Sequence, residues 1–200
     1  AAGTWIVAFA SGYNNESGDG KGRLFIVNAN TGEEIVSGGI ATAAGDTTTP
    51  SGLSKINAWV EDATNNTATR FYGGDLLGNV WRFDYDGLVE PKNSALKLGV
   101  AQMSATTQQP ITTKPMLLQA GGKPVVIVGT GRYLGEGDIT DATQQSIYAI
   151  KDPLINTGWG TIRTNVGFVK QTLTVDTTAK TASVTTNAVD WSTKAGWWVD

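Results

Sequence analysis

The chain has 200 residues, a formal net charge of −3, and neither histidine nor cysteine. These features exclude a histidine general base, a thiol nucleophile and disulfide bonds. The weak negative charge argues against a nucleic-acid-binding surface, and no apolar run reaches the roughly 18 residues of a membrane span. With 25 glycines and only 16% charged residues, the composition favours short strands joined by turns. We expect residues 1–200 to form a single all-β domain cut from a longer protein, since no initial methionine or signal peptide is present.

The first predicted element is a hairpin. Residues 5–13 and 24–32 read as two strands, and the polar, glycine-rich segment Asn14–Gly22 reads as the loop between them. Residues 24–27 are apolar at every position, which predicts that both faces of the second strand are buried, as in a stacked sheet.

Part of this loop is similar to the start of a calcium-binding loop. Asn15, Ser17 and Asp19 alternate and are followed by Gly20. Ile26, however, stands where such a loop places its bidentate glutamate. We therefore interpret the segment as a solvated hairpin loop.

A connector and a second strand follow. Residues 37–54 are small and polar, which predicts a connector with little order of its own. Residues 56–60 read as a strand, and residues 61–66 as the turn that leads into the next hairpin.

The most informative stretch is the hairpin Tyr72–Asp84. Gly73 and Gly74 are expected to let the backbone leave the first strand. Asp75 can accept backbone N–H bonds and close an Asx-turn, and Gly78 supplies the positive φ that such a turn needs.

Aromatic residues on the second strand of this hairpin predict its burial. Trp81 and Phe83 fall on one face, whereas Val80 and Arg82 fall on the other. Two large aromatic side chains on one face indicate that this face packs against another layer.

A third hairpin has the same pattern. Residues 125–134 and 146–152 form its strands, and Gly121-Gly122 predicts a turn that adds a preceding strand. Phe25, Trp81 and Tyr148 occupy equivalent positions in the three hairpins. Repeated hairpins of this size are typical of β-propeller blades, and a β-sandwich built from three unrelated hairpins is the alternative.

The last 48 residues are less regular. Residues 168–175 and 181–185 can pair as a threonine-rich hairpin. Trp197 and Trp198 then point to opposite faces of a final strand, so one should be buried and the other is free to lie in an interface.

Several of these segments occur in the same order in a known family. The specific ones are Tyr72–Asp84 and Gly129–Leu134, and Gly12–Asn14, Leu24–Gly32 and Gln145–Asp152 accompany them. Over most of residues 5–152 the chain resembles the C-terminal β-propeller region of the PilY family, the pilus-tip-associated proteins of bacterial type IV pili. The resemblance implies a propeller fragment of the type also found in quinoprotein enzymes, with residues 197–198 in a closing strand.

The resemblance also implies a function. It indicates a non-catalytic module that supports pilus assembly and surface attachment, exported to the periplasm or cell surface. The implied partners are pilin or minor pilin subunits, the rest of the same chain, and a host or surface receptor.

The family often has a calcium site in the turn before the central hairpin. Counting back from Asp75, the resemblance places its ligands at Glu61, Ala63, Asn65 and Thr69. Ala63 has no ligating side chain and Thr69 carries no charge, whereas Ca²⁺ prefers six to eight oxygens, several of them anionic. A register shifted by one brings Asp62, Asn65 and Asn66 nearby, which is still a poor set. Calcium therefore stays an open alternative with a degenerate loop, and no cofactor, metal-binding residue or catalytic residue is assigned.

Two other functions fit parts of the sequence. Blade-like strands are compatible with a quinoprotein dehydrogenase, but the adjacent cysteines that such enzymes use are absent. Seven tryptophans are compatible with a carbohydrate-binding β-module. The acidic pairs Glu33-Glu34 and Glu61-Asp62 do not predict a glycosidase, because neighbouring strand residues face opposite ways.

The number of repeats predicts an incomplete ring. Propellers remove exposed strand edges by closing four to eight blades into a circle. Three repeats, even with the C-terminal hairpin, make a short ring at best. We therefore expect an arc of a larger propeller that is open at both ends.

Overall fold

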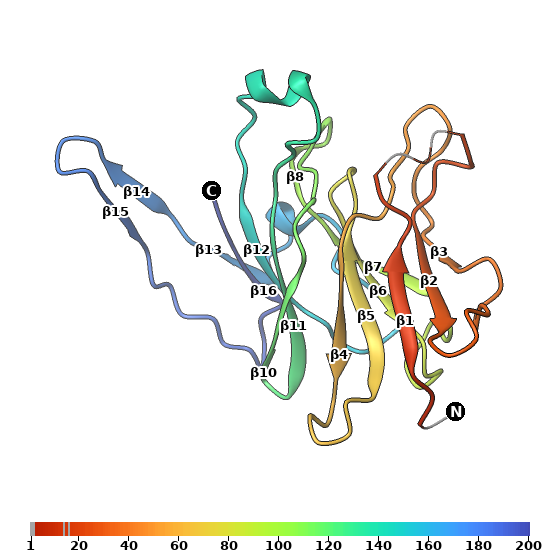
Figure 1. Ribbon diagram of the computed structural model, residues 1–200. Helices are drawn as coiled ribbons and strands as arrows, with labels where there is room; N and C mark the ends of the chain where they lie inside the picture. The colour runs from red at the N-terminus through yellow and green to blue at the C-terminus, as the bar shows by residue number, and fades with distance from the viewer. Residues whose placement is uncertain (1–2, 14, 16) are drawn as a thin grey trace.

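The structure is a computed structural model that describes residues 3–13, 15 and 17–200. Within these residues the chain forms three main sheets that follow one another across the molecule, as Figure 1 shows. Two are antiparallel, and the third is antiparallel except for one parallel pair of strands at its edge. Two separate hairpins and two short 3₁₀ helices complete the described part of the fold. The chain is therefore almost wholly β, as the composition predicts.

The first two sheets are meanders of consecutive strands, whereas in the third the final strand of the chain lies between two earlier ones. The first sheet has the order β1-β2-β3, with bounds Ile6–Ala10, Arg23–Asn28 and Ile40–Ala41. The second has the order β4-β5-β6-β7, with bounds Ile56–Val60, Ala68–Gly74, Asn79–Asp84 and Ala95–Val100. The third has the order β10-β11-β12-β16-β13, with bounds Met116–Ala120, Lys123–Gly129, Ile147–Lys151, Gly196–Val199 and Phe168–Lys170.

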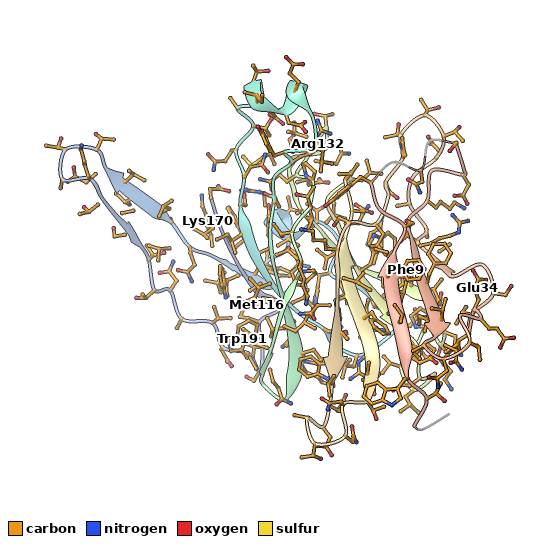
Figure 2. All side chains as sticks on the ribbon, viewed as in Figure 1. Phe9, Glu34, Met116, Arg132, Lys170 and Trp191 are labelled. Atoms are coloured by element: carbon orange, nitrogen blue, oxygen red, sulfur yellow. The ribbon has the colours of Figure 1, made fainter. Side chains whose placement is uncertain are left out.

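The remaining elements are excursions from these sheets. The small hairpin of β8 (Gln102–Ser104) and β9 (Thr107–Gln108) follows the second sheet. The 3₁₀ helices η1 and η2 cover Glu136–Thr140 and Ile162–Thr164. The threonine-rich hairpin of β14 (Leu173–Asp176) and β15 (Thr181–Val184) extends away from the rest of the molecule, and its side chains stand clear of the others in Figure 2.

Equivalent hydrogen bonds join successive sheets and establish which strands correspond. Leu53 N–H donates to Gly12 C=O, directly after β1 and before β4. Ile111 N–H donates to Asp75 C=O, directly after β5 and before β10. β1 therefore corresponds to β5, and β4 to β10. The sheets are blades of a propeller, and this succession of three layers replaces the two-sheet β-sandwich alternative.

Two apolar cores lie between neighbouring blades. One contains Leu24 and Ile26 of the first blade with Trp81 and Phe83 of the second. The other contains Val80 of the second blade with Val126, Tyr148 and further residues of the third. The two faces of β6 are buried in different cores, Val80 in one and Trp81 with Phe83 in the other, which confirms the predicted alternation. Trp81 is only 1% exposed.

Three local expectations need correction. Only one face of β2 is buried: Leu24 and Ile26 are inaccessible, but Phe25 and Val27 remain half-exposed because no described blade packs on their side. Residues 37–54 are ordered by packing, since they contain β3 and a fully buried Leu53.

The third correction concerns Gly73 and Gly74, which belong to β5 rather than to the turn. A Cβ atom on Gly74 would lie 2.3 Å from Cγ2 of Ile111, so the missing side chain permits close contact between blades. The glycine of the turn itself is Gly78, which has φ +76°.

Candidate functional site

The described residues contain no cluster of three or more acidic, histidine or cysteine side chains arranged to hold a metal. The sequence has no histidine or cysteine at all. Several buried polar side chains, among them Asp75, Arg82 and Asp152, are paired within turns or between blades. These groups, together with the grooves beside them, are the candidates for function.

Asp75 organises the central hairpin. Its Oδ1 accepts the N–H groups of Leu77 and Asn79, each at 2.9 Å. Its Oδ2 accepts the Asn79 amide and the Trp81 indole N–H, each at 2.8 Å. Burial raises the pKa of Asp75, although these four donors act in the opposite direction. The predicted Asx-turn is confirmed, and it also orients the buried indole of Trp81.

A buried ion pair joins the second and third blades. Arg82 on β6 donates to Asp152, directly after β12, at 2.6 Å, and both side chains are fully buried. Asp152 also accepts the Tyr72 hydroxyl at 2.7 Å. Burial, and then the Asp152 carboxylate, raise the pKa of Tyr72 above its usual range. This site is a structural bridge, because all its members are removed from water.

The turn at residues 61–69 does not fit a calcium ion. Glu61 is engaged in an ion pair with Arg70, and Asp62 accepts the N–H and hydroxyl of Thr64. The Asn65 side chain accepts the N–H of Thr67. Ala63 contributes no side-chain oxygen, and the Thr69 hydroxyl is buried without a hydrogen-bond partner. The expected positions therefore offer one unengaged neutral oxygen, whereas Ca²⁺ prefers several anionic oxygens.

The first loop is described except at residues 14 and 16. Asn14, one of the residues that carries the family resemblance, therefore lies outside the described residues. Asp19 forms a two-point contact with Arg23 at 2.7 and 2.8 Å and accepts the N–H of Lys21. The Asp19 carboxylate is therefore used to close the hairpin.

A groove of about 880 Å³ lies between the third blade and the β14–β15 hairpin. Ile147, Trp197 and Val199 line its blade side, and Leu173 and Val184 line its hairpin side. Trp198, by contrast, is 8% exposed and belongs to the core between the second and third blades. The predicted opposite orientation of the two tryptophans is confirmed.

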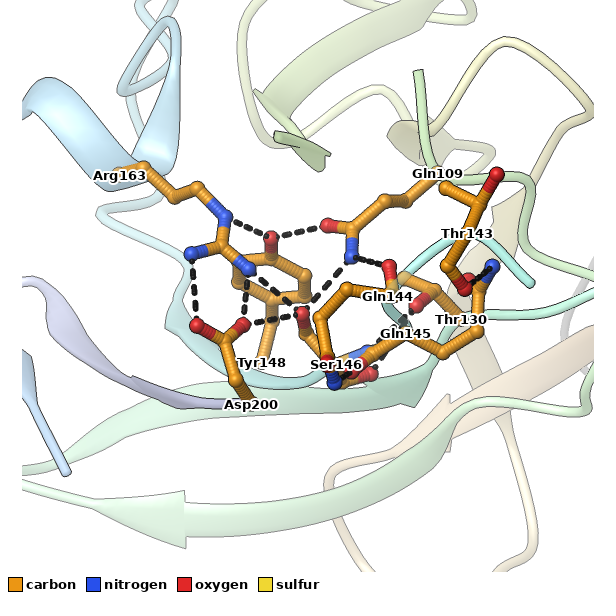
Figure 3. A network of polar contacts seen from close by, with 9 residues as sticks. All are labelled: Gln109, Thr130, Thr143, Gln144, Gln145, Ser146, Tyr148, Arg163 and Asp200. Atoms are coloured by element: carbon orange, nitrogen blue, oxygen red, sulfur yellow. Dashed lines mark hydrogen bonds and ion pairs between the residues drawn. The ribbon is translucent and has the colours of Figure 1, made fainter. Parts of the chain in front are cut away.

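Figure 3 shows a polar network that includes Ser146 and Asp200, two residues of the groove lining. Arg163 pairs with Asp200 and donates to the Ser146 hydroxyl at 2.6 Å and to the Tyr148 hydroxyl at 2.9 Å. Its guanidinium also lies 4.2 Å from the ring of Trp198. Gln109, from before β10, donates to Ser146 at 2.8 Å and accepts the Tyr148 hydroxyl.

The network fixes β16 and η2 to the centre of the third blade. Ser146 and Asp200 also line the groove, so the network supplies polar groups beside its apolar side chains. Within the network the Ser146 hydroxyl donates to the Asp200 carboxylate at 2.7 Å, and Arg163 contacts both groups.

Comparison with known proteins relates this architecture to a family. A family model described as the PilY1 beta-propeller domain matches residues 1–188. The chain belongs to the PilY1 β-propeller family. The crystal structure of the Pseudomonas aeruginosa PilY1 C-terminal domain superposes on the whole chain with a TM-score of 0.78 and 26% identity, and the chain covers 48% of that domain.

Curated PilY1 relatives agree with this assignment. A type IV pilus biogenesis factor PilY1 homolog of Xylella fastidiosa is 30% identical over 155 residues, which cover 75% of this chain and 11% of the relative. The type IV pilus biogenesis factor PilY1 of Pseudomonas aeruginosa is 29% identical over 238 aligned positions, which cover 99% of this chain and 20% of the relative. The chain thus spans about a tenth to a fifth of the length of these PilY1 proteins.

The sequence alone did not predict the buried ion pair of Arg82 with Asp152 or the polar network around Arg163. The position of Arg82 does indicate a buried partner, because a charged residue between Trp81 and Phe83 on a buried strand requires one. Nothing local identified that partner as Asp152 or connected Arg163 with Ser146, since each pair is distant in sequence.

Proposed function

We propose that the chain is a non-catalytic propeller module of a type IV pilus biogenesis factor, exported with the pilus, that supports pilus assembly and surface attachment. The family match over residues 1–188 carries the proposal, and the relatives are named as pilus biogenesis factors. Pilin or minor pilin subunits, the rest of its own polypeptide and a surface receptor are the proposed partners. The described residues include no helix of the length and apolarity that a membrane crossing requires.

The arrangement of buried polar groups supports a scaffold rather than an enzyme. Asp75, Asp152 and Arg82 are inaccessible and hold turns and blades together. The accessible surfaces at the ends of the arc are apolar and suited to protein contacts. The seven tryptophans do not support a carbohydrate-binding face, because Trp5 and Trp197 lie on opposite end blades while Trp81 and Trp198 are buried.

A genetic replacement tests the proposal. In a piliated bacterium that encodes this chain, deletion of the segment for residues 1–200 should reduce surface pili, measured as pilin in sheared fractions, and attachment to an inert surface. Trp81→Ala, which disrupts the core, should reproduce the loss, whereas Leu88→Ser on an exposed loop should not. Normal piliation and attachment after the deletion would contradict the proposal.

A further inference from the structure

The first blade lacks a strand that both other blades have. In the second blade β5 pairs with β4, and in the third β11 pairs with β10. The corresponding strand of the first blade is β1, as the bond from Leu53 to Gly12 establishes. Across the described residues β1 pairs with β2 and has no strand on its other side.

Backbone groups are directed toward this open edge. Ser11 N–H donates to Arg23 C=O, and Ala29 N–H donates to Trp5 C=O. In an antiparallel pair such bonds alternate, so Ile6, Ala8 and Ala10 direct their N–H and C=O groups away from β2. The next residue in this alternation, Gly12, confirms the direction, because its N–H and C=O both bond to Leu53 of the following blade segment.

A cleft of about 850 Å³ runs beside the open edge. Ile6 and Ala8 of β1 line one side, and Ile56 and Ala58 of β4 line the other. The four side chains are apolar and contact the core between the first and second blades. The edge therefore offers unpaired hydrogen-bonding groups beside apolar side chains, the two features by which a sheet recognises an added strand.

We propose that the edge of β1 accepts one further strand, which pairs antiparallel and completes a four-stranded first blade. The occupant is an extended segment of about five residues with small or branched apolar side chains toward the cleft, similar in chemistry to β4. We assign it to the propeller's own polypeptide outside residues 1–200. This source is favoured because the chain covers only 48% of the solved PilY1 domain and 20% or less of the relatives named above. The proposal does not depend on the role in pili.

Amide exchange on the ¹⁵N-labelled 200-residue chain tests the edge, with a synthetic peptide of residues 55–61 as the probe strand. At free peptide ten times its Kd, exchange at Ile6, Ala8 and Ala10 should slow about tenfold. Val7 and Phe9 already face β2 and should change little. Equal slowing at all five positions, or none, would overturn the proposal.

Modified peptides and chain variants make the test specific. Two peptides are N-methylated at every second residue, one at the odd and the other at the even positions. The peptide whose methyl groups replace the N–H groups that face β1 should lose binding, and the other should keep it. Equal binding of the two peptides would contradict strand pairing. Ala8→Pro in the chain removes an edge N–H but no bond to β2, and should abolish peptide protection. The matched control Val7→Thr should retain it, and if Ala8→Pro does not fold, the two peptides still decide.

The source of the strand is tested separately. In the full-length protein, exchange across residues 3–13 should already be slow and should not respond to the peptide. Fast exchange there would overturn the assignment to the same polypeptide. Protection of Ile6, Ala8 and Ala10 that rises with concentration of the 200-residue chain alone would instead identify a second copy as the occupant.

Discussion

Trp81 is the side chain on which the core between the first and second blades most depends. It is 1% exposed, packs with Leu24 and Phe83, and donates its indole N–H to Asp75. Trp81→Ala should lower the free energy of unfolding by about 3–5 kcal/mol, measured by urea denaturation. Trp81→Phe, which keeps an aromatic ring but removes one of the four donors to Asp75, should cost less. A loss near zero for the alanine variant would contradict the burial of this residue.

Asp75 stabilises its turn through four accepted hydrogen bonds. Asp75→Ala leaves those buried donors unsatisfied and should cost about 1–3 kcal/mol. Asp75→Asn retains one acceptor oxygen and should be milder. The comparison is made at neutral pH by thermal and urea unfolding, and an asparagine variant as damaging as the alanine variant would argue against this account.

Arg82 and Asp152 should show strong coupling. Removing one partner leaves a buried charge, so Asp152→Ala should cost about 3–5 kcal/mol. The double variant Arg82→Met/Asp152→Leu removes both charges and should cost less than the sum of the single variants. Urea unfolding of the four proteins gives the coupling energy. Strict additivity would mean that the two charges do not interact in the folded state.

Among the elements, the turn at residues 61–69 should be independent of calcium. Its two acidic side chains already have local partners, Arg70 for Glu61 and Thr64 for Asp62. The thermal midpoint of the isolated chain should therefore be the same with millimolar Ca²⁺ and with chelator. A rise with Ca²⁺ that disappears in the variant Glu61→Gln/Asn65→Ala would show that the turn binds the ion after all.

The strands could be predicted from sequence where local pattern determines them. Alternation around Trp81 and Phe83 located β6 and its two faces, and the glycine pair at 121–122 located the turn between β10 and β11. The short strand β3 could not be predicted, because it is fixed by the pairing of Ile40 with Leu24. The strand predicted over residues 168–175 was given the wrong partner in its first part, since β13 pairs with β16, Phe168 with Gly196, and only residues 173–176 pair with β15. The partners of Arg82 and Arg163 could not be predicted for the same reason, because they are also distant in sequence.

For the molecule as a whole, the two end faces of the arc predict self-association. Val7 and Phe9 are exposed on the first blade, and Met116 and Ile147 are exposed on the third. Light scattering of the isolated chain should detect oligomers, and Phe9→Lys/Ile147→Lys should reduce them. Leu88→Lys, an exposed apolar position away from the end faces, is the control. A well-behaved monomer of the wild-type chain would argue against open end faces.

The repeated join between blades has a consequence for the order of folding. Leu53 attaches to Gly12, and Ile111 attaches to Asp75, so each blade begins at a contact made by the blade before it. When the chain is synthesised from its amino terminus, the contact site for each new blade therefore lies on a blade that has already been made. Growth can proceed by addition at one end, without a search among distant segments, which shortens the time during which unpaired strands are exposed to aggregation.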